Sequence, residues 1–290
     1  MALAVCGAYT AAVEVAPARP REPADVRTDG STFNVVDAAG NTIWGRPTKG
    51  TIAHAELADL DGNGNPEVIV DVGNGGDDVG KTLVYGGDGK TRWIADSTAP
   101  FNYDSGRSGR LAIQTFTTGD LFRNGQREVV SLSLDSQGWY PSRLCIFDNG
   151  GSLVASYWHP RHMHQVVVGA ETGSDAPRII VSGVNDDLRA ALHLEGYITR
   201  SSCSIRAMSR AKYLGKLRRG SELWYGVLLP ATNVVERLEI LDRDQHGKNE
   251  ISVWMSSKNA FYLSFAGQLR AVGRGDGATS GAEFHLLQKR

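Results

Sequence analysis

The feature that most constrains this chain is a short acidic pattern that recurs along it. Residues 56–70 (ELADLDGNGNPEVIV) and 238–253 (LEILDRDQHGKNEISV) both place D-x-D, a glycine-bearing loop and a glutamate before an alternating apolar run. Residues 118–131 form a weaker copy, and 168–181 keep the rhythm without the acids. The loops start at Asp59, Asp120, Ala170 and Asp242, at intervals of 61, 50 and 72 residues. This spacing predicts a repeat architecture in which each copy is one supersecondary unit.

A second repeated element trails the loops, and one further copy precedes the first loop. It consists of a strand, a turn ending in glycine and another strand, with the period-2 apolar alternation that predicts a β-hairpin. The turn glycines are Gly40, Gly89, Gly151, Gly196 and Gly267. A glycine content of 34 in 290 residues agrees with so many tight turns. Each repeat is therefore predicted to hold about four short antiparallel strands.

Four-stranded sheets repeated along a chain predict a β-propeller, which hides sheet edges by radial packing. The hairpin around Gly40 has no acidic loop before it, and residues 281–288 form a lone apolar strand. We predict that these two ends share one blade and close the ring. The expected fold is thus an all-β propeller of about five blades, four full and one composite, over residues 31–290. A β-sandwich and an open piece of a larger propeller are the alternatives.

Charge and the N-terminal segment limit the function classes. The formal net charge is −1, with 31 basic and 32 acidic residues, so no global basic field attracts a nucleic acid. Residues 1–30 are expected to be a leader or linker. Their apolar start is shorter than the roughly 20 residues that span a bilayer. It is interpreted either as a disordered leader or as the remnant of a signal or membrane-anchor segment.

The first acidic loop offers oxygen ligands at alternate positions. Ca²⁺ takes six to eight oxygen ligands, and a tight glycine-bearing loop with alternating acids can wrap one ion. The candidate ligands are Asp59, Asp61, Asn63, Asn65 through its backbone carbonyl, and Glu67. An EF-hand would need a bidentate glutamate at position 12, where this loop has Val70. The alternative is a polar turn whose side chains bond their own backbone.

The other loops offer poorer ligand sets. The fourth loop is predicted to bind Ca²⁺ more weakly, because a histidine is a poor ligand for this ion. Its candidates are Asp242, Asp244, His246, Lys248 through its carbonyl, and Glu250. In the second loop Phe122 takes the third position, and in the third loop Arg178 would repel a cation. We expect no ion in either.

The stretch D-x-D-G-N-G-x-P-E-V-I-V resembles the FG-GAP/VCBS repeat of integrin α-subunit propellers and bacterial surface proteins. The resemblance is strongest at residues 56–70, good at 238–253 and degenerate between them, and the repeat rhythm extends it over about 33–288. It implies a β-propeller with Ca²⁺ in inter-strand loops, usually outside the cytoplasm. It also implies that Ca²⁺ makes a blade rigid rather than doing chemistry, and that the domain binds proteins or glycans, in some cases as an appendage of a membrane-anchored signalling protein or a polysaccharide-active enzyme.

A basic stretch interrupts the pattern near residues 197–221, where we predict an insertion whose apolar spacing partly fits an amphipathic helix. It either packs on the propeller or docks an acidic partner, a membrane surface or an anionic glycan. The candidate partner-binding residues are Arg206, Arg210, Lys212, Lys216, Arg218 and Arg219. By contrast, Trp44 and Trp93 each lie four residues after a turn glycine, which indicates a structural role between blades.

The leading functional hypothesis is a non-catalytic, calcium-stabilised propeller that binds or senses a protein or glycan outside the cytoplasm, as a monomer. The alternative is a polysaccharide lyase or hydrolase, or its carbohydrate-binding module. That alternative requires Asp104, Asp186, Asp187 or the His159–His164 cluster to converge in one pocket. No nucleophile-elbow or phosphate-loop motif is present in the sequence.

Overall fold

Strands make up every regular element that the structure describes. The computed structural model describes residues 21–98, 101–102, 108–135, 141–159, 162–170, 172, 177–184, 203–209, 215–217, 222–229, 235–243, 245, 247–256, 258–265, 268–274 and 283–289. Within these ranges there is no helix able to cross a membrane. The all-β class is therefore confirmed for the described chain.

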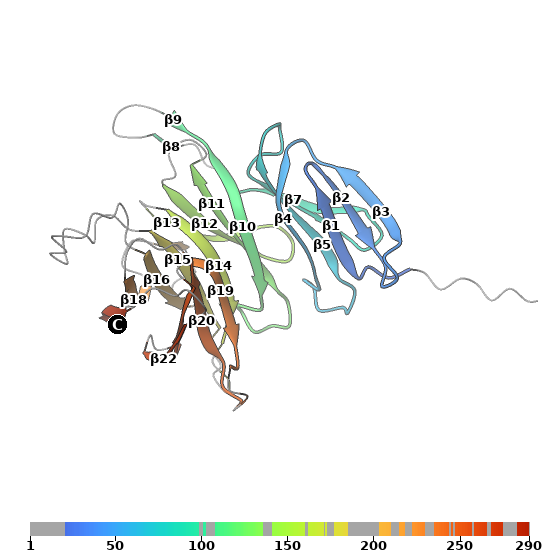
Figure 1. Ribbon diagram of the computed structural model, residues 1–290. Helices are drawn as coiled ribbons and strands as arrows, with labels where there is room; N and C mark the ends of the chain where they lie inside the picture. The colour runs from blue at the N-terminus through green and yellow to red at the C-terminus, as the bar shows by residue number, and fades with distance from the viewer. Residues whose placement is uncertain are drawn as a thin grey trace, which may run out of the picture.

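Five sheets follow one another along the chain (Figure 1). The first contains β1 (Asp25–Asp29), β2 (Thr32–Val36) and β3 (Thr42–Pro47). The second contains β4 (Thr51–Ala58), β5 (Glu67–Asn74), β6 (Lys81–Tyr85) and β7 (Thr91–Asp96). The third contains β10 (Leu111–Gly119), β11 (Glu128–Asp135), β12 (Ser142–Phe147), β13 (Leu153–His159) and β17 (Gly215–Leu217). The fourth contains β14 (Met163–Gly169), β15 (Arg178–Val184), β16 (Cys203–Ser209), β18 (Glu222–Leu229) and β23 (Glu283–Lys289). The fifth contains β19 (Val235–Leu241), β20 (Glu250–Met255), β21 (Asn259–Leu263) and β22 (Leu269–Arg274).

The first strand of each later sheet contacts its counterpart in the next sheet: β4 contacts β10, β10 contacts β14, and β14 contacts β19. The first sheet joins this row where β1 contacts β4. All pairings within the five sheets are antiparallel except that of β13 with β17. A short pair, β8 (Phe101–Asn102) with β9 (Ser108–Gly109), precedes β10. Successive sheets thus pack through their first strands, as blades do around a propeller axis.

Strand β5 shows why the inner sheets read as continuous apolar runs. Its side chains alternate between two faces, so Val68 and Val70 join the core shared with the first sheet, while Ile69 joins the core shared with the third. Both faces of this sheet are buried against neighbours, which explains the run Glu67–Val70 that is buried throughout.

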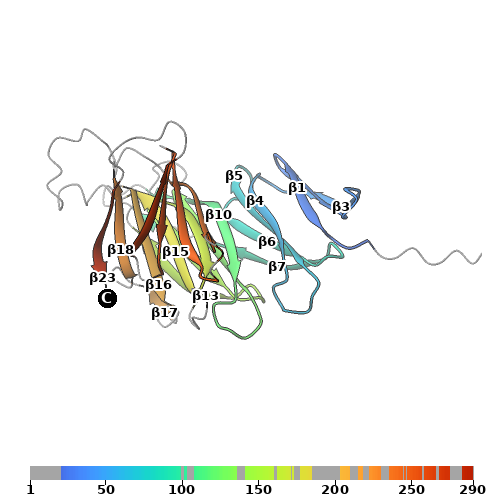
Figure 2. The ribbon, with the colours of Figure 1, turned by 60° about the horizontal axis from the view of Figure 1, so that its bottom comes forward.

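Four hydrophobic clusters join the five sheets, one between each consecutive pair. A closed ring of five sheets would have a fifth cluster between the last sheet and the first, and none is found within the described ranges. In both Figure 1 and Figure 2 the first sheet and the C-terminal strand β23 lie at opposite ends of the molecule. The described sheets therefore form an open row.

The predicted composite closing blade is wrong. Strand β23 pairs with β18, in register from Trp224 opposite Lys289 to Leu229 opposite Glu283, and so becomes the outer strand of the fourth sheet. Among the described strands, the first sheet contains β1, β2 and β3. The edge that β23 covers is that of β18, because the chain returns from the fifth sheet to its neighbour in the row.

The predicted insertion near residues 197–221 also differs from the structure where it is described. Strand β16 lies inside the fourth sheet, paired with β15 on one side and β18 on the other. Strand β17 runs parallel to β13 of the third sheet. The alternation CSIRAMS in β16 suits a strand as well as a helix, and pairing on both edges selects the strand.

Two tryptophans connect consecutive sheets, as their equivalent positions in the repeat predicted. Trp44 of β3 donates its indole N–H to the carbonyl of Gly87 at 2.9 Å, and Trp93 of β7 donates to the carbonyl of Asn149 at 2.8 Å. Each ring lies over the next turn glycine, so that a Cβ on Gly151 would come within 2.6 Å of the Trp93 ring. The structural role predicted for Trp44 and Trp93 is confirmed.

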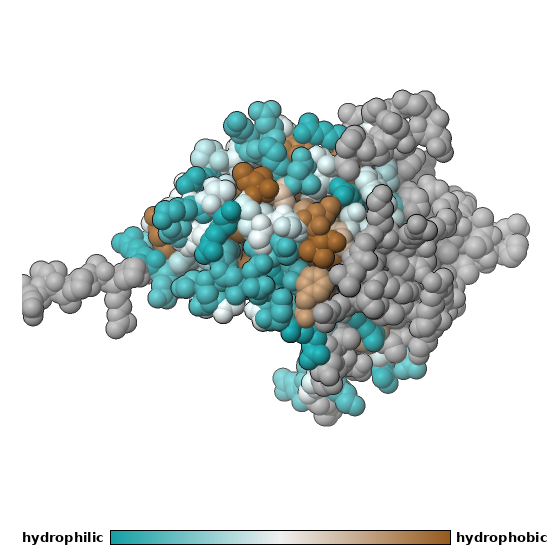
Figure 3. Space-filling view, turned by 180° about the vertical axis from the view of Figure 1, so that it is seen from behind, coloured by the Kyte–Doolittle hydropathy of each residue, from teal (hydrophilic) through white to brown (hydrophobic). Residues whose placement is uncertain are grey.

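Within the described residues, the large hydrophobic side chains that are exposed lie on late strands of three sheets. The exposed large hydrophobic side chains are Ile94 on β7, Leu153 on β13, and Leu269 and Val272 on β22. The face drawn in Figure 3 is mainly hydrophilic over its described part, with separate hydrophobic spots. The apolar surface is thus spread over outer strands of several sheets.

Candidate metal centre

Three of the acidic loops share one backbone frame. Counting Asp59, Asp120 and Asp242 as position 1, the glycine N–H at position 6 donates to the Oδ2 atom of that aspartate in every case. The distances are 2.8 Å for Gly64, 3.0 Å for Gly125 and 2.7 Å for Gly247. These glycines have φ of 86°, 81° and 75°, a left-handed conformation that other residues rarely adopt. The repeated glycine at this position is therefore required by the loop itself.

The glutamate at position 9 closes the frame in the first two loops. The Oε2 atom of Glu67 accepts the N–H of Leu60 at 2.9 Å, and that of Glu128 accepts the N–H of Leu121 at 2.7 Å. Both glutamates are buried. The loop can thus form by bonding its own backbone, as the turn alternative predicted, and a cation is an addition to this frame.

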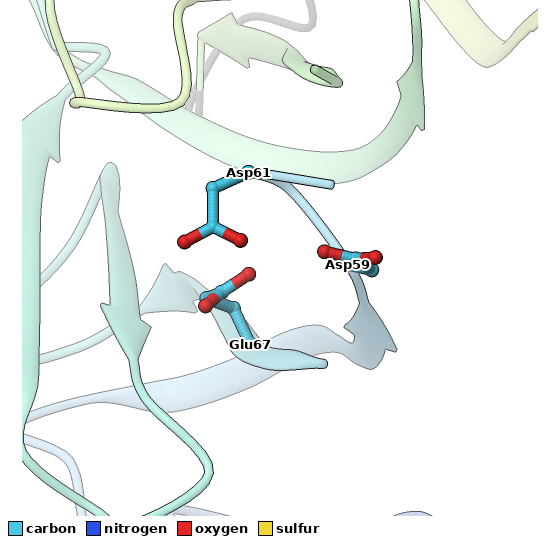
Figure 4. A group of neighbouring side chains, drawn as sticks. All are labelled: Asp59, Asp61 and Glu67. Carbon is cyan, nitrogen blue, oxygen red and sulfur yellow. The ribbon is translucent and has the colours of Figure 1, made fainter. Parts of the chain in front are cut away.

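The first loop differs from the second by a group of three carboxylates. Oxygen atoms of Asp59, Asp61 and Glu67 all lie within 4.8 Å of one another, and this is the one such acidic or histidine-bearing group within the described residues. Figure 4 shows the carboxylates of Asp61 and Glu67 turned toward each other, with Asp59 beside them. In the second loop Phe122 stands where the first has Asp61. Three negative groups this close favour a bound cation.

Glu67 gives the clearest electrostatic signal in the group. Its exposed fraction is 3%, and burial raises the pKa of its carboxyl, as does the nearby charge of Asp61. The N–H of Leu60 and the charge of Arg92 act in the opposite direction. A cation held between the carboxylates would offset the cost of keeping Glu67 charged in this environment.

Arg92 of β7 supplies one positive charge to the group. Its Nη2 atom lies 3.0 Å from Oε1 of Glu67, and its Nη1 atom lies 3.4 Å from Oδ2 of Asp61. The contact with Glu67 is close, but it does not have the geometry of a hydrogen bond. The Oε1 atom of Glu67 accordingly has no hydrogen-bond partner. The contact is therefore an ion pair between a half-exposed guanidinium and a buried carboxylate. Sequence reasoning missed Arg92, because it lies beyond the loop on another strand.

The remaining predicted ligands of the first loop are used within the turn. The side-chain oxygen of Asn63 accepts the N–H of Asn65 at 2.7 Å, and the N–H of Asn63 reaches Asp59 and Asp61 at 3.1 Å. Ligation by Asn63 and by the carbonyl of Asn65 stays a prediction.

The fourth loop is described in part. Asp242 accepts the N–H of Gly247, and Glu250 lies 3.3 Å from the Nε atom of Arg243. Lys248 is exposed. Asp244 and His246 lie outside the described residues, so calcium binding by this loop stays a prediction.

The loops also dock on one another, which links neighbouring sheets. The N–H at position 8 reaches the preceding loop: that of Arg127 donates to the carbonyl of Leu60 at 2.8 Å, and that of Asn249 donates to Oγ1 of Thr172 at 2.9 Å. Position 8 of the first loop is Pro66, which has no N–H to donate. No acidic loop precedes the first one in the sequence, so there is no preceding loop to which an N–H at this position could donate.

The other predicted sites are described only in small part. Arg206 and Lys216 lie on β16 and β17, but their side chains are outside the description, as are Arg210, Lys212, Arg218 and Arg219 in full. Asp104, Asp186 and Asp187 are also outside it. The rings of His162 and His164 lie 3.9 Å apart, and burial lowers the pKa of His162 to about 4. Burial also lowers the pKa of His164, and the two rings pack against each other at an angle.

Comparison with known proteins gives distant structural similarity alone. No family model and no curated protein matches this chain. The chain is similar to a Bacteroides caccae protein of unknown function, with 11% identity, 88% of this chain and 74% of that one covered, and a TM-score of 0.46. It is similar to rhamnogalacturonan lyase YesW, with 16% identity, 94% and 51% covered, and a TM-score of 0.46. It is also similar to BamB from Moraxella catarrhalis, with 14% identity, 89% and 74% covered, and a TM-score of 0.38.

Proposed function

We propose that this chain is a non-catalytic, calcium-stabilised, propeller-like module that binds a protein or glycan outside the cytoplasm. The observation that carries the proposal is the group formed by Asp59, Asp61 and Glu67, with ligand atoms within 4.8 Å of one another. Hard carboxylate oxygens in a glycine-bearing loop suit Ca²⁺, which also accepts backbone carbonyls and waters. The FG-GAP/VCBS resemblance of residues 56–70 points the same way.

The role of the ion follows from where the loop lies. The loop joins β4 to β5, and its Leu60 carbonyl accepts the N–H of Arg127 from the next sheet. An ion that fixes this loop would therefore stabilise the contact between two sheets as well as the turn itself. The ligand atoms of the three carboxylates lie close enough to one another to hold one cation, which supports a binding role for this loop.

We expect Ca²⁺ to raise the thermal stability of the chain and EDTA to lower it. A ligand that binds only the folded state adds RT ln(1 + [L]/Kd), about 2.7 kcal/mol when it is present at 100 times Kd. For a chain of this size that corresponds to a rise in melting temperature of roughly 5–10 °C. The measurement is thermal unfolding by circular dichroism after chelation and again with 10 mM CaCl₂ (about 100 times a Kd of 10⁻⁴ M).

Asp61→Ala should remove most of this response, because it deletes the carboxylate that the second loop lacks. Asp120→Asn is the matched control, since it removes one charge from a loop with the same frame but without the third carboxylate. The control should keep the wild-type response to Ca²⁺. An unchanged melting temperature after chelation of metal-loaded wild-type protein would refute the calcium proposal.

A further inference from the structure

In each sheet, one strand skips a residue in its pairing with the preceding strand of that sheet, at the same place each time. The pairing register jumps over the second residue of β3, β7, β13, β18 and β22, which is a β-bulge. The skipped residues are Ile43, Arg92, Val154, Leu223 and Arg270. Bulges re-aim a side chain, so this position is structurally equivalent in all five sheets.

The residue at the bulge varies with the acidic loop of its own sheet. Arginine occurs in the second and fifth sheets, whose loops contain D-x-D at Asp59 and Asp242. The other three sheets have an aliphatic residue there. Of these, the first sheet has no acidic loop, the third has Phe122 in place of the second aspartate, and the fourth has Thr172. Arginine at the bulge therefore accompanies D-x-D in both sheets, although in the fifth sheet the loop glutamate Glu250 is paired with Arg243, at 3.3 Å.

The geometry of the second sheet shows what the arginine does. The bulge directs Arg92 across the hairpin to the loop, where its guanidinium lies 3.4 Å from Asp61 and 3.0 Å from Glu67. These are two of the three carboxylates that form the candidate metal group. The Arg92 side chain is 46% exposed, so its guanidinium can move into solvent when another cation takes its place beside the buried Glu67. Arg92 is thus the exposed partner of a buried carboxylate, and a metal ion that takes its place would keep Glu67 paired.

We infer that Arg92 is a built-in cation that neutralises the acidic loop when no metal is bound and competes with Ca²⁺ for Asp61 and Glu67. This inference rests on the proposed calcium function and adds its regulation. Competition lowers the apparent affinity, so the loop fills only when Ca²⁺ is abundant, at the roughly 10⁻⁴–10⁻³ M typical of extracellular modules. The same residue keeps the emptied loop from being split by repulsion between its carboxylates.

The experiment is a calcium titration of wild-type protein, Arg92→Gln and Arg92→Lys by isothermal calorimetry after chelation. Removing the competing charge should make Arg92→Gln bind Ca²⁺ roughly three- to tenfold more tightly. Arg92→Lys, which keeps the charge, should stay closer to wild type. Arg92→Val, which copies Val154 of the third sheet, provides a second charge-free variant should glutamine disturb the hairpin.

Lys90→Gln is the matched control, because Lys90 lies on the same hairpin but pairs with Asp88 at 2.9 Å rather than with the loop. It should leave the calcium affinity unchanged. In EDTA, Arg92→Gln should melt at a lower temperature than Lys90→Gln, because only the former leaves the acidic group without a cation. Equal or weaker calcium binding by Arg92→Gln, with binding by the wild type intact, overturns the competition and leaves the calcium proposal standing. Absence of calcium binding by every variant and by the wild type overturns both.

Discussion

Asp71→Asn should make this protein more stable at neutral and alkaline pH. The Asp71 side chain is fully buried on β5, on the face toward the third sheet, and burial raises the pKa of its carboxyl from 3.8 to about 7. Ser131 donates a hydrogen bond to its Oδ2 atom at 3.4 Å, while its Oδ1 atom has no hydrogen-bond partner. His54 lies opposite Asp71 on β4, and its charge lowers the pKa of the Asp71 carboxyl, whereas the charge of Glu56 raises it.

The sign of the effect follows from the raised pKa. Below about pH 4 the carboxyl is protonated in both the folded and the unfolded chain, and it costs nothing. Between about pH 4 and pH 7 the unfolded chain releases the proton while the folded chain keeps it, so stability falls as the pH rises. A shift from 3.8 to about 7 corresponds to a loss on the order of 4 kcal/mol. Asparagine, which is neutral at every pH, removes this loss.

The test is urea unfolding of wild type and Asp71→Asn from pH 4 to pH 8. The two should be nearly equal at pH 4, and the variant should be more stable by up to roughly 4 kcal/mol at pH 8. Asp88→Asn, on an exposed hairpin turn, is the control and should show no such gain. A difference between Asp71→Asn and wild type that stays constant with pH would mean that Asp71 is charged in the folded protein at pH 5.

Trp93→Ala should destabilise the protein by about 2–4 kcal/mol, less than a fully buried tryptophan because this ring is half-buried. The substitution removes the ring that covers Gly151 and the indole hydrogen bond to the carbonyl of Asn149. Both contacts cross from the second sheet to the third, so the loss falls on an inner interface. The measurement is the free energy of unfolding in urea.

Trp93→Phe separates the two contributions. It keeps most of the ring packing and loses the N–H donor, so its cost should be about 1 kcal/mol. Trp44→Ala provides a comparison at the interface of the first and second sheets, where Trp44 makes the equivalent ring contact and hydrogen bond. If Trp93→Ala costs no more than Trp93→Phe, the ring contributes little to joining the sheets.

The sequence predicted local structure better than long-range closure. The turn glycines and the alternation around them gave the hairpins at Gly40, Gly89 and Gly151, which have φ near 80° as such turns require. The equivalent positions of Trp44 and Trp93 in the repeat predicted that both pack between sheets. The partner of the strand at residues 283–289 was predicted wrongly, because an isolated apolar strand carries no signal for the edge that it covers.

The sequence predicted the loop of the candidate site but not the residues that surround the loop in the fold. Asp59, Asp61 and Glu67 could be found because their spacing within one turn brings them together. Arg92 is 25 residues beyond Glu67 and becomes a neighbour only through the pairing of β5, β6 and β7. The burial of Asp71 was equally hidden, since it depends on which face of β5 meets the third sheet.

The open row of sheets has a consequence for cooperativity. Among the described residues, four hydrophobic interfaces link the five sheets, so each sheet is coupled there to its nearest neighbours, as in linear repeat arrays. A sheet at either end can come apart by giving up one interface, whereas an inner sheet must give up two. The second sheet, which contains the loop that begins at Asp59, is an inner one. If it unfolds, the first sheet loses its contact with the rest of the chain. A cation bound in this loop would therefore stabilise the sheet on which that contact depends.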